Sequence, residues 1–322
     1  MGANLSAASE EPNASPGVNQ GLRKVMPEVS IIIPTYNSAK YVTDAVDSVL
    51  DQSFSDLEVL VIDDGSTDDT ESVMGRYTAS VRYIRQQNRG VAAARNRGIT
   101  ESRGRYVAFL DADDTWLPDK LERQIAALTT HPDHQFCYTA FTLVTSDFEP
   151  LATVRSNRHG PALEDLLLRG NVVGSICTVL CERSLFETSG GFDPDLSQCA
   201  DWDMWVRLAA LTEFLYLDRP TVTYRQHGSN MSRNAPLLEQ DSLRVLKKAF
   251  GLPEVPDNIR AKRRTAFARN DMVLAGTYFH AHLYWDFLRC AARSVSMDLR
   301  QLTYLVGFPV RIMKRALPRH AD

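Results

Sequence analysis

The chain has 322 residues, enough for one large domain or two modest ones, and is 44% hydrophobic and 24% charged. That composition is ordinary for a soluble globular protein. A formal net charge of -4 argues against a general attraction to nucleic acid, and no apolar stretch is long enough for a membrane-spanning helix. The five cysteines do not have a zinc-binding spacing, so we expect reduced core residues and a cytoplasmic protein.

The first 27 residues are polar and contain almost no large apolar side chains. Because such a segment cannot form a packed core and lacks the apolar stretch of a signal peptide, we expect a disordered tail over 1–27. The first six residues also fit the N-myristoylation pattern. That pattern is short enough to match by chance, so disorder is the simpler interpretation.

From residue 29 onward, apolar β-branched runs alternate with helical spacing. The predicted strands are 29–33, 57–62, 81–84 and 105–110. The predicted helices between them cover 42–50, a segment from about 68, and 91–99. This alternation predicts a parallel sheet with helices on both faces, and such sheets bind ligands beyond the carboxyl ends of their strands.

Three polar clusters follow three of these strands, at residues 34–37, 63–66 and 111–114. They are spread over about eighty residues of sequence, yet a parallel sheet would bring them to one edge. A single such cluster would fit a solvated turn. Three at equivalent positions predict a binding site.

The alternation is less regular after Thr115. The remaining expected elements are a helix from 118 to before Pro132, a strand at 135–144, a helix at 161–169, a strand-like run at 175–181, a turn at 190–194, a helix at 201–211, short strands at 214–217 and 221–224, and helices from about 236 to the end. Most of these have the apolar spacing of elements that cover or extend a sheet.

The crowded carboxylates at Asp111, Asp113 and Asp114 allow two chemistries. The segment DADDT fits the D-x-D-x-[TV] nucleophile pattern of haloacid-dehalogenase-like phosphatases, but at least three strands precede it and no partner lysine and acid pair is evident. Alternatively, Asp111 and Asp113 lie on one side of an extended segment and hold a divalent cation, Mg²⁺ or Mn²⁺. Motifs for dinucleotide binding, for a P-loop and for a serine hydrolase are absent.

Four segments resemble, in order and spacing, the successive motifs of glycosyltransferase family 2: SIIIPTYN at 30–37, VIDDGSTD at 61–68, NRG with ARNRG at 88–98, and FLDADD at 109–114. The resemblance covers about residues 29–232. It implies the GT-A fold, an α/β Rossmann-like, mostly parallel sheet flanked by helices. It also implies a nucleotide-sugar donor and inversion at the anomeric carbon.

On the donor side, the resemblance assigns roles to ten residues. They are Pro34, Thr35, Tyr36, Asn37, Asp64, Arg95, Asp111, Ala112, Asp113 and His227. Thr35 and Tyr36 are placed to contact the nucleobase, Asp64 resembles an acid that binds a uracil N–H, and Asp111 faces ribose or sugar hydroxyls. Asp113 resembles the main metal ligand, and His227, in the family's closing segment, meets the diphosphate or the metal.

On the acceptor side, the expected catalytic base is Asp201. The family often has Glu-Asp at the start of this helix, but Ala200 stands where Glu is common. Asp203 is the alternative base, with pairing to Arg207 four residues later as its structural role. The loop at 190–193 resembles one that shapes the acceptor pocket.

These assignments predict a GT-A domain at 28–233, with a nucleotide-binding half at 28–117 and an acceptor-binding half at 118–233. A helical region follows at 234–322. We expect a metal-dependent inverting glycosyltransferase that uses a nucleotide sugar, with UDP favoured by the resemblance, and a glycan or lipid-linked acceptor in cell-surface polysaccharide or glycoconjugate synthesis. The alternatives are a family-like domain that binds the donor without turnover and the phosphatase.

The C-terminal end, residues 297–322, mixes large apolar residues with arginine and lysine. Such an end can rest on an anionic membrane surface, which predicts peripheral contact at the inner face of the membrane. Packing of these helices onto the catalytic domain is the alternative.

Overall fold

A computed structural model of the chain describes residues 26–156, 161–228 and 234–307. Nearly all of the predicted N-terminal tail, including the myristoylation pattern, therefore lies outside the described residues. The same holds for the end of the family's closing segment after Gly228 and for the basic end of the chain from residue 308.

The first half of the chain forms the parallel sheet that the sequence predicts. Its strands are β1 (Val29–Thr35), β2 (Leu57–Asp63), β3 (Val81–Arg85) and β4 (Tyr106–Phe109), in the spatial order β3-β2-β1-β4. The connections contain α1 (Val42–Leu50), α2 (Thr70–Met74), a 3-10 turn (Gly75–Tyr77) and α3 (Val91–Glu101). All seven residues of β1 are buried, as expected for a central parallel strand.

The second half of the chain extends this sheet beyond β4. The added strands are β8 (Leu180–Glu182), β6 (Phe136–Val144), β9 (Phe214–Arg225) and β5 (Thr115–Trp116), with β7 (Pro150–Val154) paired to β6. The longest pairing, between β6 and β9, is parallel, whereas β4 with β8, β6 with β8, β6 with β7 and β5 with β9 are antiparallel. The architecture is the predicted α/β sheet, mostly parallel and flanked by helices.

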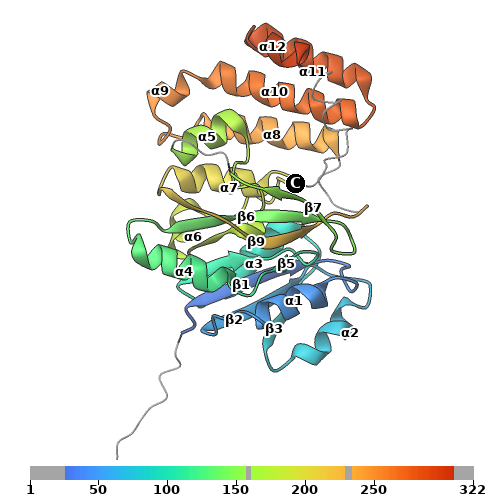
Figure 1. Cartoon of the computed structure of the whole chain (residues 1–322), viewed down its shortest axis with the longest axis vertical. Helices are drawn as coiled ribbons and strands as arrows, with labels where there is room; N and C mark the ends of the chain where they lie inside the picture. The colour runs from blue at the N-terminus through green and yellow to red at the C-terminus, as the bar shows by residue number, and fades with distance from the viewer. Residues whose placement is uncertain (1–25, 157–160, 229–233, 308–322) are drawn as a thin grey trace, which may run out of the picture.

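Helices cover the extended sheet and then stack away from it (Figure 1). Those of the second half are α4 (Lys120–Thr130), α5 (Ala162–Arg169), α6 (Ser184–Ser189) and α7 (Ala200–Ala209). The C-terminal helices are α8 (Ala235–Ala249), α9 (Asp257–Arg260), α10 (Arg263–His280), α11 (Tyr284–Met297) and α12 (Gln301–Val306). Helices α8 and α10 pack on α7 and α5, and α11 and α12 pack on α10. No helix in the described part of the chain has the length and apolar character needed to span a bilayer.

Several sequence-based boundaries were wrong. The two short strands expected at 214–217 and 221–224 are one strand, β9, because a register shift opposite Thr139 and Ala140 accommodates the segment around Pro220. The run at 175–181 is a 3-10 turn (Ile176–Thr178) followed by the short strand β8, since the Ser175 side chain accepts the Cys177 N–H and starts the turn. Strands β5 and β7 and helix α6 were not predicted.

The parallel register confirms that the three polar clusters share one edge of the sheet. Thr35, the last residue of β1, pairs with Asp63 of β2, and the Leu110 N–H after β4 donates to the Ile32 carbonyl. Helix α3 lies close on this sheet because Gly98 has no side chain. A Cβ at Gly98 would lie 2.3 Å from Ile32 Cγ2. That close approach fixes α3, and with it Arg95, beside the ends of the strands.

Candidate functional site

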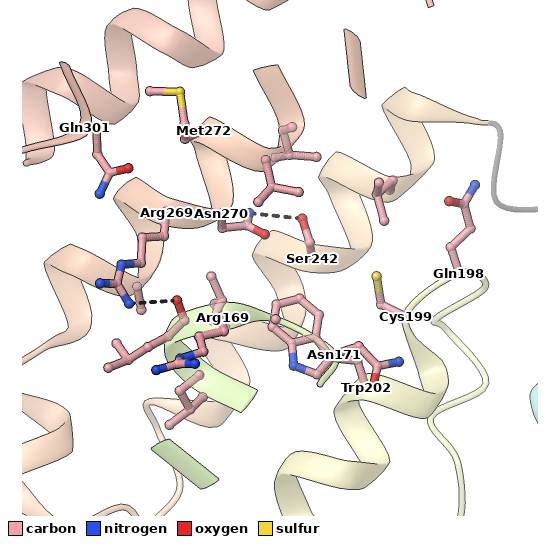
Figure 2. Close-up of a pocket in the computed structure, with 18 of the residues that line it drawn as sticks. Arg169, Asn171, Gln198, Cys199, Trp202, Ser242, Arg269, Asn270, Met272 and Gln301 are labelled. Carbon is pink, nitrogen blue, oxygen red and sulfur yellow. Dashed lines mark hydrogen bonds between the residues drawn. The ribbon is translucent and has the colours of Figure 1, made fainter. Parts of the chain in front are cut away.

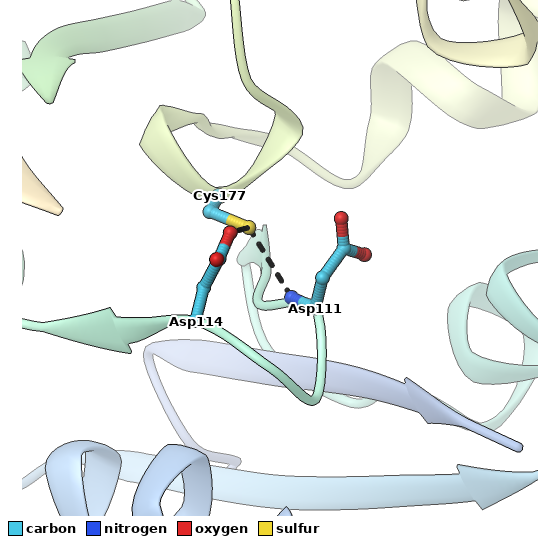
Figure 3. Close-up of side chains that lie close together, drawn as sticks. All are labelled: Asp111, Asp114 and Cys177. Atoms are coloured by element: carbon cyan, nitrogen blue, oxygen red, sulfur yellow. Dashed lines mark hydrogen bonds between the residues drawn. The ribbon is translucent and has the colours of Figure 1, made fainter. Parts of the chain in front are cut away.

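The turn after β4, residues 111–114 (hereafter the acid turn), is held by the buried thiol of Cys177 and by the end of β9. The Cys177 thiol lies 3.2 Å from Asp114 Oδ2, and its sulfur accepts the Asp111 N–H at 3.2 Å. Figure 3 shows this contact, with the Asp111 carboxylate pointing away from the sulfur. The Arg225 N–H, at the end of β9, donates to Asp114 Oδ1 at 2.9 Å. Asp114 is therefore a structural acid that fixes the turn.

Asp111, Asp114 and Cys177 place one ligand atom each within 4.8 Å of one another, a spacing that could hold a cation. The hydrogen bonds that these groups already make argue against it. Burial, with Asp113 and Asp111 nearby, raises the pKa of Asp114 well above its usual range, and burial likewise raises the pKa of the Cys177 thiol. A cysteine sulfur is a soft ligand, whereas hard cations prefer oxygen. These two groups act as hydrogen-bonded support for the acid turn.

The side chains of Asp113, in the acid turn, and His227, just after β9, are in contact. His227 Nε2 lies 2.8 Å from Asp113 Oδ2, and its ring stacks on Tyr41 with centroids 4.9 Å apart. Neighbouring vertices of an octahedron with bonds of about 2.1 Å are about 3 Å apart, so these two atoms have the spacing of adjacent ligands. Carboxylate oxygen suits Mg²⁺ and Mn²⁺, and a neutral imidazole nitrogen is a common metal ligand. The residues present fit a divalent cation.

Arg95 joins the acid turn to the acceptor side. Its Nη2 donates to Asp111 Oδ1 at 2.7 Å, and its guanidinium lies 5.7 Å from the centre of the Phe192 ring. Although Arg95 is buried, its Nε has no hydrogen-bond partner among the described residues. Asp201 lies close enough to interact with the Arg95 charge. One buried cation thus stands between the predicted sugar-binding acid and the predicted base.

Asp201 lies in the first turn of α7, where its carboxylate is oriented by two donors. Asn171 Nδ2 donates to Oδ2 and the Trp202 N–H donates to Oδ1, each at 2.8 Å. Burial raises the pKa of Asp201, while the Arg95 charge and these two hydrogen bonds oppose that rise. The result is an ionisable carboxylate with a raised pKa, as proton abstraction from a hydroxyl requires.

Asp203, the alternative base, is engaged in ion pairs with Arg207 and Lys248. Its carboxylate contacts Arg207 at 2.8 Å and Lys248 at 2.9 Å, and it is buried. The Arg207 contact is the structural role that the sequence predicted. Asp203 therefore ties α7 to α8.

The segment after β1 carries the predicted nucleobase contacts. Pro34 and Thr35 are buried, and Thr35 Oγ1 has no hydrogen-bond partner among the described residues. Tyr36 is half-exposed, so it is not packed into the following helix. Asn37 adopts a left-handed φ of 50° and its N–H donates to Ser66 Oγ at 2.9 Å, which joins the first two polar clusters. Ala112, in the acid turn, is buried.

Asp64 orders the loop that leads into α3. Its two oxygens accept hydrogen bonds from Gln86 Nε2 at 2.8 Å, the Arg89 N–H at 3.0 Å and the Gly90 N–H at 2.7 Å. Its neighbour Asp63 instead closes its own turn, because Oδ1 accepts the Ser66 N–H and hydroxyl at 2.8 and 2.6 Å. A carboxylate accepts about four hydrogen bonds, so Asp64 retains capacity for one more.

Sequence reasoning did not find four contributors to this site: Tyr41, Asn171, Cys177 and Arg225. Cys177 was correctly expected to be a reduced core residue, since it is free and buried, but its contact with the acid turn carries no sequence signature. Asn171 lies in a loop thirty positions before Asp201, so only tertiary structure brings them together.

Comparison with known proteins agrees with this fold. The sequence model described as Glycosyl transferase family 2 matches residues 30–188. The chain is 35% identical over 215 residues to the "Putative teichuronic acid biosynthesis glycosyltransferase TuaG" of Bacillus subtilis, which covers 65% of this chain and 82% of TuaG. The chain belongs to glycosyltransferase family 2 and is a glycosyltransferase. This membership decides against the phosphatase interpretation of the acid turn.

Two solved structures share the fold. Residues 1–349 of TarS from S. aureus superpose with a TM-score of 0.60 at 17% identity, covering 82% of this chain and 90% of that one. The mannosyltransferase PcManGT from Pyrobaculum calidifontis, in complex with GDP-Man and Mn²⁺, gives a TM-score of 0.56 at 20% identity, covering 89% and 83%. At these identities the likeness supports the GT-A architecture alone.

Proposed function

We propose that this glycosyltransferase is metal-dependent and inverting, and that it moves a sugar from a nucleotide-sugar donor to a hydroxyl group of a glycan or lipid-linked acceptor. One observation carries the proposal. Asp111 binds Arg95, and Arg95 interacts with Asp201, so a donor-side acid and an acceptor-side base share one buried cation. Asp113 and His227 adjoin the same acid turn.

The donor is a nucleotide sugar, and UDP is the favoured nucleotide. TarS has been solved with UDP and with UDP-GlcNAc, and PcManGT with GDP-Man, which supports the class of donor. In this proposal the nucleobase stacks near the half-exposed Tyr36, and the remaining acceptor capacity of Asp64 takes a uracil N–H. The unpartnered Thr35 hydroxyl supports a ligand contact at the same edge.

The transfer step needs a base on the side opposite the leaving group. Asp201 takes the proton of the acceptor hydroxyl as its oxygen bonds to the anomeric carbon. The bond from that carbon to the diphosphate breaks, and the electron pair leaves with the nucleoside diphosphate. Asp111 binds donor hydroxyls while Arg95 holds the Asp111 carboxylate and opposes the rise in the pKa of Asp201, so this chain supplies orientation as well as the base.

Asp113 and His227 would hold the divalent cation, Mg²⁺ or Mn²⁺. When bound, the cation supplies positive charge beside the diphosphate leaving group. Asp114 and Cys177 keep the acid turn in place without contacting the ligand, and the Arg225 N–H fixes the end of β9 so that His227 reaches Asp113.

A two-stage experiment tests this function. A thermal-shift screen of nucleotide sugars with Mn²⁺ and Mg²⁺ identifies the donor, and release of nucleoside diphosphate then measures turnover. Asp201→Asn should bind the donor normally but lose about 10² to 10⁴ in rate, whereas Asp113→Ala should lose the metal-dependent shift. Asp257→Asn, an exposed acid on α9, is the control. Wild-type turnover in either site variant contradicts the proposal, and binding without turnover in the wild type would favour the non-catalytic alternative.

We also propose that the outer C-terminal helices contact an anionic membrane. The inner faces of α8 and α10 pack onto α7 and α5, yet Trp285, Leu299 and Val306 remain 86%, 77% and 75% exposed. Exposed tryptophan and aliphatic side chains suit the membrane interface, and the residues after α12 include Arg311, Lys314, Arg315 and Arg319.

Vesicle flotation tests the membrane contact. The full chain should float with vesicles that contain phosphatidylglycerol, and the chain lacking residues 297–322 should not. A Trp285→Ser variant should float less than the wild type, since it removes the largest exposed apolar side chain. Equal recovery of all three chains would refute the membrane contact and leave simple packing of the helices.

A further inference from the structure

A cavity of about 480 Å³ lies between the catalytic sheet's covering helices and the C-terminal helices. One wall comes from the end of α5 and the start of α7, with Asn171, Asp201 and Trp202. The other wall comes from α8, α10 and α12 (Figure 2). The proposed base therefore lines a space that the C-terminal helices complete.

The wall opposite Asp201 is mostly apolar. Its aliphatic and aromatic members are Leu238, Leu246, Met272, Val273, Leu274 and Tyr304. The polar side chains Ser242 and Asn270 satisfy one another at 3.1 Å, as the dashed line in Figure 2 shows. A cavity that served only a free sugar would need several hydrogen-bonding groups, because sugar hydroxyls lose water on binding. This wall instead favours a hydrocarbon group.

The mouth of the cavity carries positive charge. Arg169 and Arg269 both line it and are exposed. Arg169 pairs with Asp165 at 3.1 Å, whereas Arg269 has no ion pair within the described residues and makes one 3.4 Å contact with the Leu168 carbonyl. An anionic group on the ligand would find its partner here.

We infer that this cavity binds the acceptor, and that the acceptor is amphiphilic, with its sugar hydroxyl at Asp201 and an apolar group along α8, α10 and α12. The inference rests on the proposed function, since it takes Asp201 as the base. It goes further by assigning the C-terminal helices to acceptor selection and by choosing a lipid-linked acceptor over a free glycan.

Binding of alkyl glycosides tests the inference. Each methylene that enters the cavity should tighten binding about fourfold, so octyl glucoside should bind at least tenfold more tightly than methyl glucoside. Titration calorimetry below the micellar concentration measures both constants. Val273→Glu puts a charge on the cavity wall, so this variant should bind octyl and methyl glucoside with similar affinity. Leu302→Glu, at an exposed apolar position outside the cavity, should still bind octyl glucoside at least tenfold more tightly than methyl glucoside.

Hydrolysis of the donor by water separates this inference from the proposed function. Octyl glucoside should lower the rate of sugar release in the wild type several-fold, because it displaces water from Asp201, and should not do so in Val273→Glu. If the donor is hydrolysed but both glucosides bind equally, or if both variants weaken octyl glucoside equally, the acceptor inference is wrong. If no nucleotide sugar is turned over, the proposed function fails, whatever the alkyl chain does.

Discussion

Lys120, at the start of α4, is a fully buried amine, and it gives a quantitative test of the structure. Its Nζ lies 4.0 Å from the centre of the Trp116 ring and donates to Gln124 Oε1 at 2.6 Å. No carboxylate is paired with it within the described residues, and the ionisable groups near it are cysteines. Burial lowers the pKa of Lys120 to about 7, and we predict that Lys120→Met removes a pH-dependent cost from the folded state.

The magnitude follows from the difference between that pKa and the value of about 10.4 for an unfolded lysine. Between these values the unfolded chain holds a proton that the folded chain has released, so the free energy of unfolding rises with pH across this window. The slope is about 1.4 kcal/mol per pH unit, or about 2 kcal/mol from pH 7 to pH 8.5. At pH 7.5 the lowered pKa of Lys120 reduces the free energy of unfolding by about 4 kcal/mol. The Lys120→Met variant avoids this loss, but it leaves Gln124 Oε1 without its donor, which costs about 1 to 3 kcal/mol.

Urea unfolding of the wild type and Lys120→Met at several pH values from 6 to 8.5 measures the effect. The wild type should gain about 2 kcal/mol relative to the variant between pH 7 and 8.5, and the variant should be the more stable of the two at pH 7. Groups that titrate in both proteins, such as the buried cysteines, cancel in this difference. Lys247→Met, on the exposed side of α8, should follow the wild type. Parallel curves for wild type and Lys120→Met would show that Lys120 is not buried as described.

Three further outcomes follow from the site. Asn171→Ala should move the acid limb of the pH–rate profile up by about 1 pH unit, because it removes a hydrogen bond that favours the ionised form of Asp201, and an unmoved limb would rule out Asp201 as the titrating base. Cys177→Val should weaken donor binding in calorimetry while Cys177→Ser retains it, and equal affinities would show that the thiol does not hold the acid turn. Asp203→Ala should cost roughly 3 kcal/mol in urea unfolding with normal turnover per folded molecule, whereas lost turnover would restore it as a rival base.

The sequence predicted the parallel half of the sheet well because each strand there is a continuous apolar run followed by a polar turn. β1 and β2 are buried on both faces, so their apolar runs alone indicated strands of a parallel sheet. The same logic brought the acid turn to the edge of the sheet where Thr35 and Asp63 end their strands. The family motifs then supplied roles for those residues.

The second half could not be predicted as well, because its short strands exist only through their partners. β5 has two residues and is held by Thr115 and Trp116 pairing with β9. The support of the site is equally non-local, since Cys177 and Arg225 reach Asp114 from 63 and 111 positions away. The cavity beside Asp201 depends on helices that follow it by dozens of residues, and no local pattern in α8 or α10 indicates a ligand.

The loop at 190–193 connects the nucleotide-binding half of the domain to the acceptor-binding half. The sequence suggested that it shapes the acceptor pocket, yet in the structure it is joined to α3: Asn96 Nδ2 donates to the Phe192 carbonyl at 2.8 Å, and Asn96 Oδ1 accepts the Phe192 N–H at 2.7 Å. A Cβ at Gly191 would lie 2.4 Å from Asn96 Oδ1, so a larger residue there would displace the Asn96 amide from this contact. Arg95 is the neighbour of Asn96 on α3, and the loop precedes α7. The spacing of α3, which carries Arg95, and the loop that precedes α7 is therefore set by a two-point contact between the Asn96 amide and the Phe192 backbone, and such positioning suits a base that must meet an anomeric carbon.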